Sequence, residues 1–165
     1  MGEFNGKIVA EFTPPKTWVL EKGLSFKTDD LTDAEIFTLK QIGANIAESG
    51  RISCKKGMRT DLASVPRMVW NIIAPWDIAR AAVIHDHLYA SLRSFYNTSF
   101  GETGPKTKSV HKETWSKGRA IADKVLLLAM DSAEPSVPAW KKNSAYWSVR
   151  TFGWVPAKRK RDENL

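Results

Sequence analysis

The sequence predicts an α+β fold, in which a small N-terminal antiparallel sheet is followed by a predominantly helical C-terminal half. Residues 7–62 contain short apolar and alternating segments separated by glycine and proline, which is typical of strands. Residues 66–152 instead carry apolar residues at three- and four-residue steps, which is the period of a buried helix face. The 165 residues, 42% of them hydrophobic and 26% charged, suffice for one ordinary domain. We therefore expect a single domain over residues 1–156 and a basic tail over residues 157–165.

The expected strands are short and are separated by turn residues. The first ends at Pro14 and Pro15, Gly23 lies between the second and third, and Gly57 lies between the last two. The expected strands cover residues 7–12, 18–20, 24–27, 51–54 and 58–62. Cys54 is expected to lie in a strand and to have no catalytic role.

Helical periodicity and capping residues predict the remaining elements. Ser64 followed by Pro66 is a typical start of a short helix, and Asp77 is a suitable N-cap for the helix that carries His85. The polar, glycine-containing stretch over residues 97–109 is expected to be a surface loop. The expected helices cover residues 32–46, 69–73, 78–92, 112–130 and 139–151.

The helix expected over residues 78–92 carries polar side chains on its apolar stripe. His85 and Tyr89 lie one turn apart on the same stripe as Ile78 and Leu92. An imidazole buried without hydrogen-bond partners would destabilise the fold by roughly 1 to 3 kcal/mol. The sequence therefore predicts that a polar group elsewhere in the chain holds His85.

Composition limits the environment and the partners of the chain. The single cysteine excludes an internal disulfide, which fits a reducing compartment or a virus particle assembled in one. No apolar run approaches the ~20 residues that span a bilayer and no secretion signal is evident, so we expect synthesis and folding in the cytosol. A net charge of +7 predicts an acidic partner such as nucleic acid, phospholipid headgroups or an acidic protein, unless the basic residues form only a solvated face.

Three short motifs carry the polar residues of interest. They read TDLASVPR at residues 60–67, HDHLY at residues 85–89 and RAIAD at residues 119–123. Together they resemble the signature of an uncharacterised protein family that is common in tailed phages and prophages, over roughly residues 51–153. This resemblance implies a protein made in the host cytoplasm and associated with the virion or its assembly, but it implies no established activity.

The second and third motifs are also similar to the phospholipase A2 pattern, including compact forms carried by viral capsids. This resemblance implies that His85 is a general base toward water, that Asp86 is a calcium ligand, and that Tyr89 and Asp123 orient the histidine. The chain departs from the pattern because it has no glycine between residues 57 and 101, where the enzymes have a calcium-binding glycine-rich loop.

Calcium takes six to eight oxygen ligands, so Asp86 alone cannot bind it. Asp61 could add a carboxylate and Ser64 a hydroxyl. A zinc site is the alternative, with His85, Asp86 and Asp123 as ligands and Asp61 as an additional candidate. His87 and His111 are further candidate ligands.

The same residues also have purely structural interpretations. Asp61 and Ser64 are suitable caps for the helix that begins near Pro66. Arg119 and Asp123 are four residues apart and could form a helical ion pair worth about 0.3 to 0.5 kcal/mol. The histidine and tyrosine of the HDHLY motif would then belong to a polar structural core.

Two functional hypotheses follow from the sequence. The first is a phage-encoded, metal-dependent hydrolase that acts on the host envelope, on lipid ester or cell-wall peptide. The second is a non-catalytic virion protein of the tail or of the head–tail connection, whose basic, aromatic C-terminus docks on phage structural proteins or DNA. In the first hypothesis the basic tail binds anionic lipid headgroups.

Overall fold

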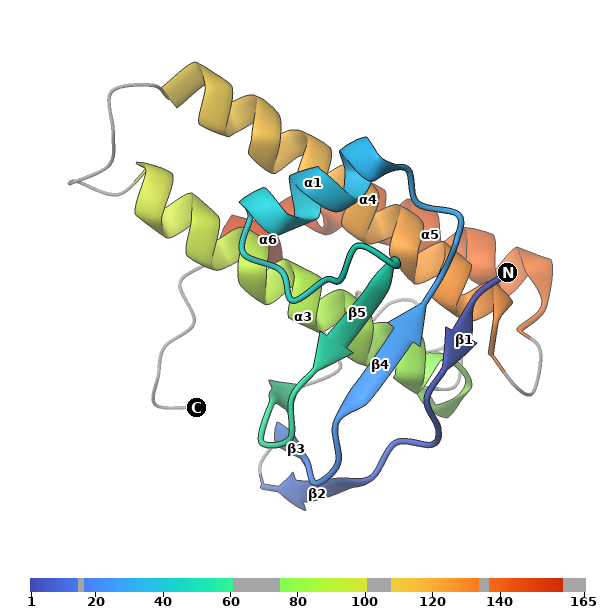
Figure 1. The fold of residues 1–165 in the computed structure, drawn as a ribbon. Helices are drawn as coiled ribbons and strands as arrows, with labels where there is room; N and C mark the ends of the chain where they lie inside the picture. The colour runs from blue at the N-terminus through green and yellow to red at the C-terminus, as the bar shows by residue number, and fades with distance from the viewer. Residues whose placement is uncertain (15–16, 61–74, 101–107, 134–136, 159–165) are drawn as a thin grey trace.

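The computed structural model describes residues 1–14, 17–60, 75–100, 108–133 and 137–158. It confirms the α+β fold: short antiparallel strands make up the N-terminal part, and helices make up the rest (Figure 1). The strands form two small sheets, where the sequence predicted one.

The first sheet has the order β1-β4-β5 and the second has the order β2-β3-β6. In the first, β4 pairs with β1 on one side and with β5 on the other, with Phe26 opposite Ile52. The strands are β1 (Glu3–Phe4), β2 (Ala10–Thr13), β3 (Thr17–Leu20), β4 (Leu24–Lys27), β5 (Arg51–Cys54) and β6 (Arg59–Thr60). The expected strand over residues 7–12 is thus displaced to β2, and β1 was missed because two residues show no periodicity.

The helices of the described part are α1 (Asp33–Gln41), α3 (Pro75–Phe100), α4 (Lys108–Asp131), α5 (Ala139–Phe152) and α6 (Trp154–Lys158). A capping box starts α1: the Thr32 hydroxyl accepts from the Glu35 amide, and the Glu35 carboxylate accepts from the Thr32 amide. The helix ends before the expected residue 46, since Gly43 has a φ of 82° and Ile46 pairs with Ile52.

Two other boundaries differ from the sequence prediction. Pro75 already lies in α3, so Asp77 is inside the helix and is not its N-cap. The helices extend into the expected loop over residues 97–109 at both ends, because α3 continues to Phe100 and α4 begins at Lys108. The Thr98 hydroxyl donates to the Ser94 carbonyl oxygen, which lets a polar residue remain helical. The helix expected over residues 69–73 lies outside the described residues.

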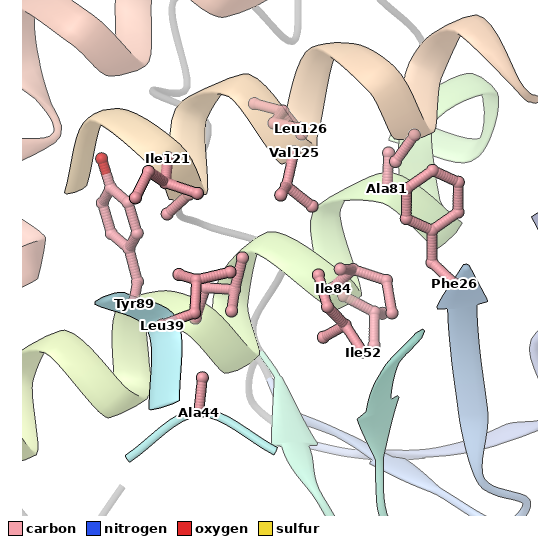
Figure 2. Close-up of a cluster of buried hydrophobic side chains, with 14 of the residues drawn as sticks. Phe26, Leu39, Ala44, Ile52, Ala81, Ile84, Tyr89, Ile121, Val125 and Leu126 are labelled. Carbon is pink, nitrogen blue, oxygen red and sulfur yellow. The ribbon is translucent and has the colours of Figure 1, made fainter. Parts of the chain in front are cut away.

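The core lies where α3 meets β4 and β5 on one side and α4 on the other (Figure 1). Figure 2 shows Phe26 and Ile52 of the strands, Ile84 of α3 and Val125 of α4 in this cluster, and all four are buried. The two long helices are antiparallel, because the end of α3 contacts the start of α4 at Tyr96 and Trp115.

A close approach of helices positions the polar residues. A Cβ on Gly118 of α4 would lie 3.2 Å from side-chain atoms of both Ile42 and Leu92. The missing side chain lets α4 pack closely against α1 and α3. Five residues later along α4, Asp123 lies beside His85 of α3.

Candidate active site

Three buried polar side chains meet between α3 and α4. The Nε2 atom of His85 lies 3.0 Å from Oδ1 of Asp123, and the Tyr89 hydroxyl donates to the same oxygen at 2.8 Å. The rings of His85 and Tyr89 are 4.1 Å apart between centroids. All three residues are 0% exposed. The structure thus places Tyr89 and Asp123 in the positions that an orienting pair for His85 would occupy.

Arg150 of α5 completes the coordination of the carboxylate. Its Nη1 atom donates to Oδ2 of Asp123 at 2.8 Å. Arg119 instead contacts the end of α5, where its Nη1 atom donates to the Arg150 carbonyl oxygen at 3.2 Å. Within the described part of the chain, the arginine paired with Asp123 is therefore Arg150. Arg119 hydrogen-bonds to the last turn of α5, which carries Arg150.

The hydrogen bonds set the protonation states. Burial raises the pKa of Asp123, but hydrogen bonds from His85, Arg150 and Tyr89, together with the charge of His85, outweigh burial and lower it. Burial and the charge of Asp123 raise the pKa of Tyr89, so the phenol stays protonated and donates. Asp123 is therefore an ionised acceptor at neutral pH.

An ionised carboxylate can only accept, so His85 must donate its Nε2–H to Asp123. In the neutral ring the other nitrogen, Nδ1, then carries the lone pair. The Nδ1 atom is buried and has no hydrogen-bond partner among the described residues. A histidine held in this way presents a basic nitrogen opposite the carboxylate that fixes it.

Asp86 faces another part of the fold, because adjacent helical residues point about 100° apart. Its Oδ2 atom accepts a hydrogen bond from the hydroxyl of Thr60 at the end of β6. Burial, followed by the charge of Asp86, raises the pKa of Cys54 to about 12. Cys54 lies in β5, as predicted, and its thiol is protonated at neutral pH. A protonated thiol is a poor nucleophile.

The family profile described as "protein of unknown function (DUF1353)" matches residues 39–149. The chain belongs to the DUF1353 family. No curated protein and no solved structure matches it. The matched region of this DUF1353 protein includes His85, Tyr89, Arg119 and Asp123, and it ends one residue before Arg150.

Two of the other predicted ligands, His87 and His111, lie away from His85 in the described part of the chain. His87 accepts a hydrogen bond at Nε2 from the Asn45 amide at 3.2 Å, and burial lowers its pKa. His111 packs edge-on against Phe95 and lies about 18 Å before Asp123 along α4. Asp61 and Ser64 lie outside the described residues. Within the described ranges, no group of three or more His, Cys, Asp or Glu residues could hold a metal ion.

Sequence reasoning missed Arg150 and Thr60 as members of the polar clusters. The sequence does indicate that some cation pairs with Asp123, because Asp123 lies in an apolar helical segment and a buried carboxylate needs a cation. Nothing in the sequence distinguishes Arg150 from a solvated arginine, however. Gly153 was also missed: a Cβ there would lie 2.3 Å from the Tyr89 hydroxyl oxygen.

Replacing Asp123 by asparagine should make stability less dependent on acid pH. The lowered pKa of Asp123 means that its contribution is present above its unfolded pKa of about 3.9 and is lost as pH falls through the folded pKa. Asp123→Asn should lower the free energy of unfolding by about 3 kcal/mol near neutral pH. Its stability should then fall less steeply in acid, as measured by urea unfolding from neutral pH downward.

Glu48→Gln serves as the control, since it removes a carboxylate that is 93% exposed. This control should keep the acid dependence of the parent protein. Equal acid slopes for the parent and for Asp123→Asn would show that Asp123 is not held ionised by its partners.

Gly153→Ala should destabilise the fold by about 2 kcal/mol or more, because its Cβ would lie 2.3 Å from both the Tyr89 hydroxyl oxygen and the Val149 carbonyl oxygen. The destabilisation should be smaller in a Tyr89→Phe background, where the hydroxyl is missing. A double-mutant cycle on thermal unfolding measures this coupling. Gly57→Ala is the control: a Cβ there meets nothing within 4 Å, so its effect should be equal in both backgrounds. A cycle without coupling would place Gly153 away from Tyr89.

Proposed function

We propose that this protein is a hydrolase in which His85 is the general base. The proposal rests on the different surroundings of the two nitrogen atoms of the His85 ring. Its Nε2 atom lies 3.0 Å from the ionised Asp123, whereas its buried Nδ1 atom has no hydrogen-bond partner among the described residues. Buried polar atoms are normally satisfied, and a catalytic role is one explanation of an exception.

The chemistry follows from this arrangement. The Nδ1 atom takes a proton from water as the water oxygen attacks a carbonyl carbon. Asp123 stabilises the resulting imidazolium, and Tyr89 and Arg150 hold the carboxylate in place. The imidazolium then returns the proton to the leaving oxygen as the ester C–O bond breaks. The products are a carboxylic acid and an alcohol.

Metal dependence is part of the proposal, with Asp86 as one ligand. Asp61 would be a second ligand and Ser64 an additional oxygen ligand, and both lie outside the described residues. Such oxygen ligands suit calcium better than zinc. A divalent cation there would polarise the substrate carbonyl and stabilise negative charge on its oxygen.

The preferred substrate is a lipid ester of a bacterial envelope, and cell-wall peptide comes second. The similarity of the HDHLY and RAIAD motifs to the phospholipase A2 pattern supports the ester. The phage setting rests on the motif resemblance, which implies a protein made in the host cytoplasm and associated with the virion or its assembly. Among the described helices, none is long and apolar enough to cross a membrane.

A second candidate function is a non-catalytic virion protein. It is favoured by the complete burial of His85, Tyr89 and Asp123 and by the Arg150 contact that joins α5 to α4. In this case the network would stabilise the fold, and the C-terminal region would bind phage structural proteins or DNA.

Hydrolysis assays on the purified protein distinguish the two candidates. Phospholipid vesicles and peptidoglycan are offered with calcium, with zinc or with a chelator, and released fatty acid or soluble peptide is measured. The proposal predicts metal-dependent release by the parent protein. His85→Gln should lower the rate by about 10²- to 10⁴-fold.

His87→Gln is the matched control, because it removes a histidine of the same helix that contacts Asn45 instead of Asp123. This variant should keep its activity, and circular dichroism checks that both variants are folded. Equal rates for the parent and a folded His85→Gln would refute the general base. A folded parent that hydrolyses no substrate and copurifies with particle proteins would favour the virion role.

A further inference from the structure

Three tryptophans form a line along α5 and α6. Trp140, Trp147 and Trp154 are seven residues apart, which places them on one face of a helix. They are 56%, 65% and 51% exposed. Val155, which follows Trp154, is also exposed, at 46%. We call these four residues the tryptophan face.

The opposite face of the same helices is buried and carries small residues. Ala145, Val149 and Ala157 are 0% exposed, and Gly153 is buried between them. A helix of a soluble domain normally turns its large apolar side chains to the core. In α5 and α6 the arrangement is reversed, since the large rings point outward. A large exposed apolar surface of this kind usually marks an interaction site.

The two helices hold this face in a fixed geometry. The Gly153 amide donates to the Val149 carbonyl oxygen and the Ala157 amide donates to the Gly153 carbonyl oxygen, so hydrogen bonding continues from α5 into α6. Lys158 lies 5.2 Å from the Trp115 ring centroid and 5.7 Å from that of Trp154. These cation–π contacts fasten α6 to α4. The tryptophan face is thus presented on a packed scaffold.

The charge of these helices favours an anionic partner. Residues 139–158 contain four basic residues and no aspartate or glutamate. Arg150 pairs with Asp123 and Lys142 with Asp131, so the basic side chains near the tryptophan face are Lys141 and Lys158. Lys141 lies 5.8 Å from the Trp140 ring centroid, at one end of the face, and Lys158 lies at the other end. Tryptophan and phenylalanine combined with lysine and arginine are typical of helices that lie in the interface of a bilayer.

We propose that the tryptophan face docks on the surface of an anionic phospholipid bilayer. The indole rings enter the headgroup region, where tryptophan is enriched in membrane proteins, and the lysines at both ends contact lipid phosphates. Trp140 and Trp147 lie two turns apart on α5, about 10 Å along its axis, and Trp154 is the first residue of α6. This docking does not depend on hydrolysis by His85.

Flotation with vesicles of ether-linked lipids tests the proposal, because these lipids have no ester that a hydrolase could cleave. One set contains phosphatidylcholine alone, and the other contains phosphatidylcholine with phosphatidylglycerol. The full-length protein should float with the anionic vesicles, and high salt should weaken its binding. Trp147→Ser should weaken binding about tenfold, and the triple variant of Trp140, Trp147 and Trp154 to serine should weaken it further.

Phe37→Ser is the control, since Phe37 lies on α1 and is 61% exposed. This variant should bind vesicles as the parent does, and circular dichroism should show that the triple variant is folded. Absence of the parent protein from the floated fraction, or equal binding by a folded triple variant, would overturn the proposal. It would also be overturned if the triple substitution left vesicle binding intact but abolished self-association or DNA binding.

Discussion

The buried carboxylate of Asp123 is the group on which the rest of the structure depends. An ionised carboxylate in a protein interior is destabilising by several kcal/mol unless its oxygens are paired. Here one oxygen accepts from His85 and Tyr89 of α3, and the other accepts from Arg150 of α5. The requirement to satisfy one side chain of α4 therefore fixes the positions of α3 and α5 on either side of it.

The same constraint bears on the proposed catalytic role of the cluster as well as on its structural role. Tyr89 and Arg150 would help to satisfy the carboxylate without a histidine. Adding His85 leaves its buried Nδ1 atom without a hydrogen-bond partner in the described part of the chain, which is unfavourable for stability alone. A hydrolase gains from this arrangement because a fixed tautomer presents a basic nitrogen. This unsatisfied atom supports the proposed catalytic role over a purely structural one.

Periodicity and short motifs predicted the fold class and the residues His85, Tyr89 and Asp123 of the candidate site. The contact of Arg150 with Asp123 depends on tertiary packing, which no local pattern shows. His85 and Tyr89 were found from their place on an apolar stripe, and Asp123 from its motif. Arg150 could not be found, because only the packing of α5 on α4 separates it from a solvated arginine. Polar composition also misled at residues 97–100, where the Thr98 hydroxyl donates to the helix backbone and α3 continues. The predicted ligand Asp61 lies outside the described residues.

Nitrogen-15 NMR of the histidine side chains tests the central claim most directly, with His85→Gln used to assign the resonances. The account predicts that the neutral form of the His85 ring carries its proton on Nε2 and the lone pair on Nδ1. Asp123→Asn should disturb this preference, because the amide can both donate and accept. The other neutral tautomer, with the proton on Nδ1 and the lone pair on Nε2, would contradict the account.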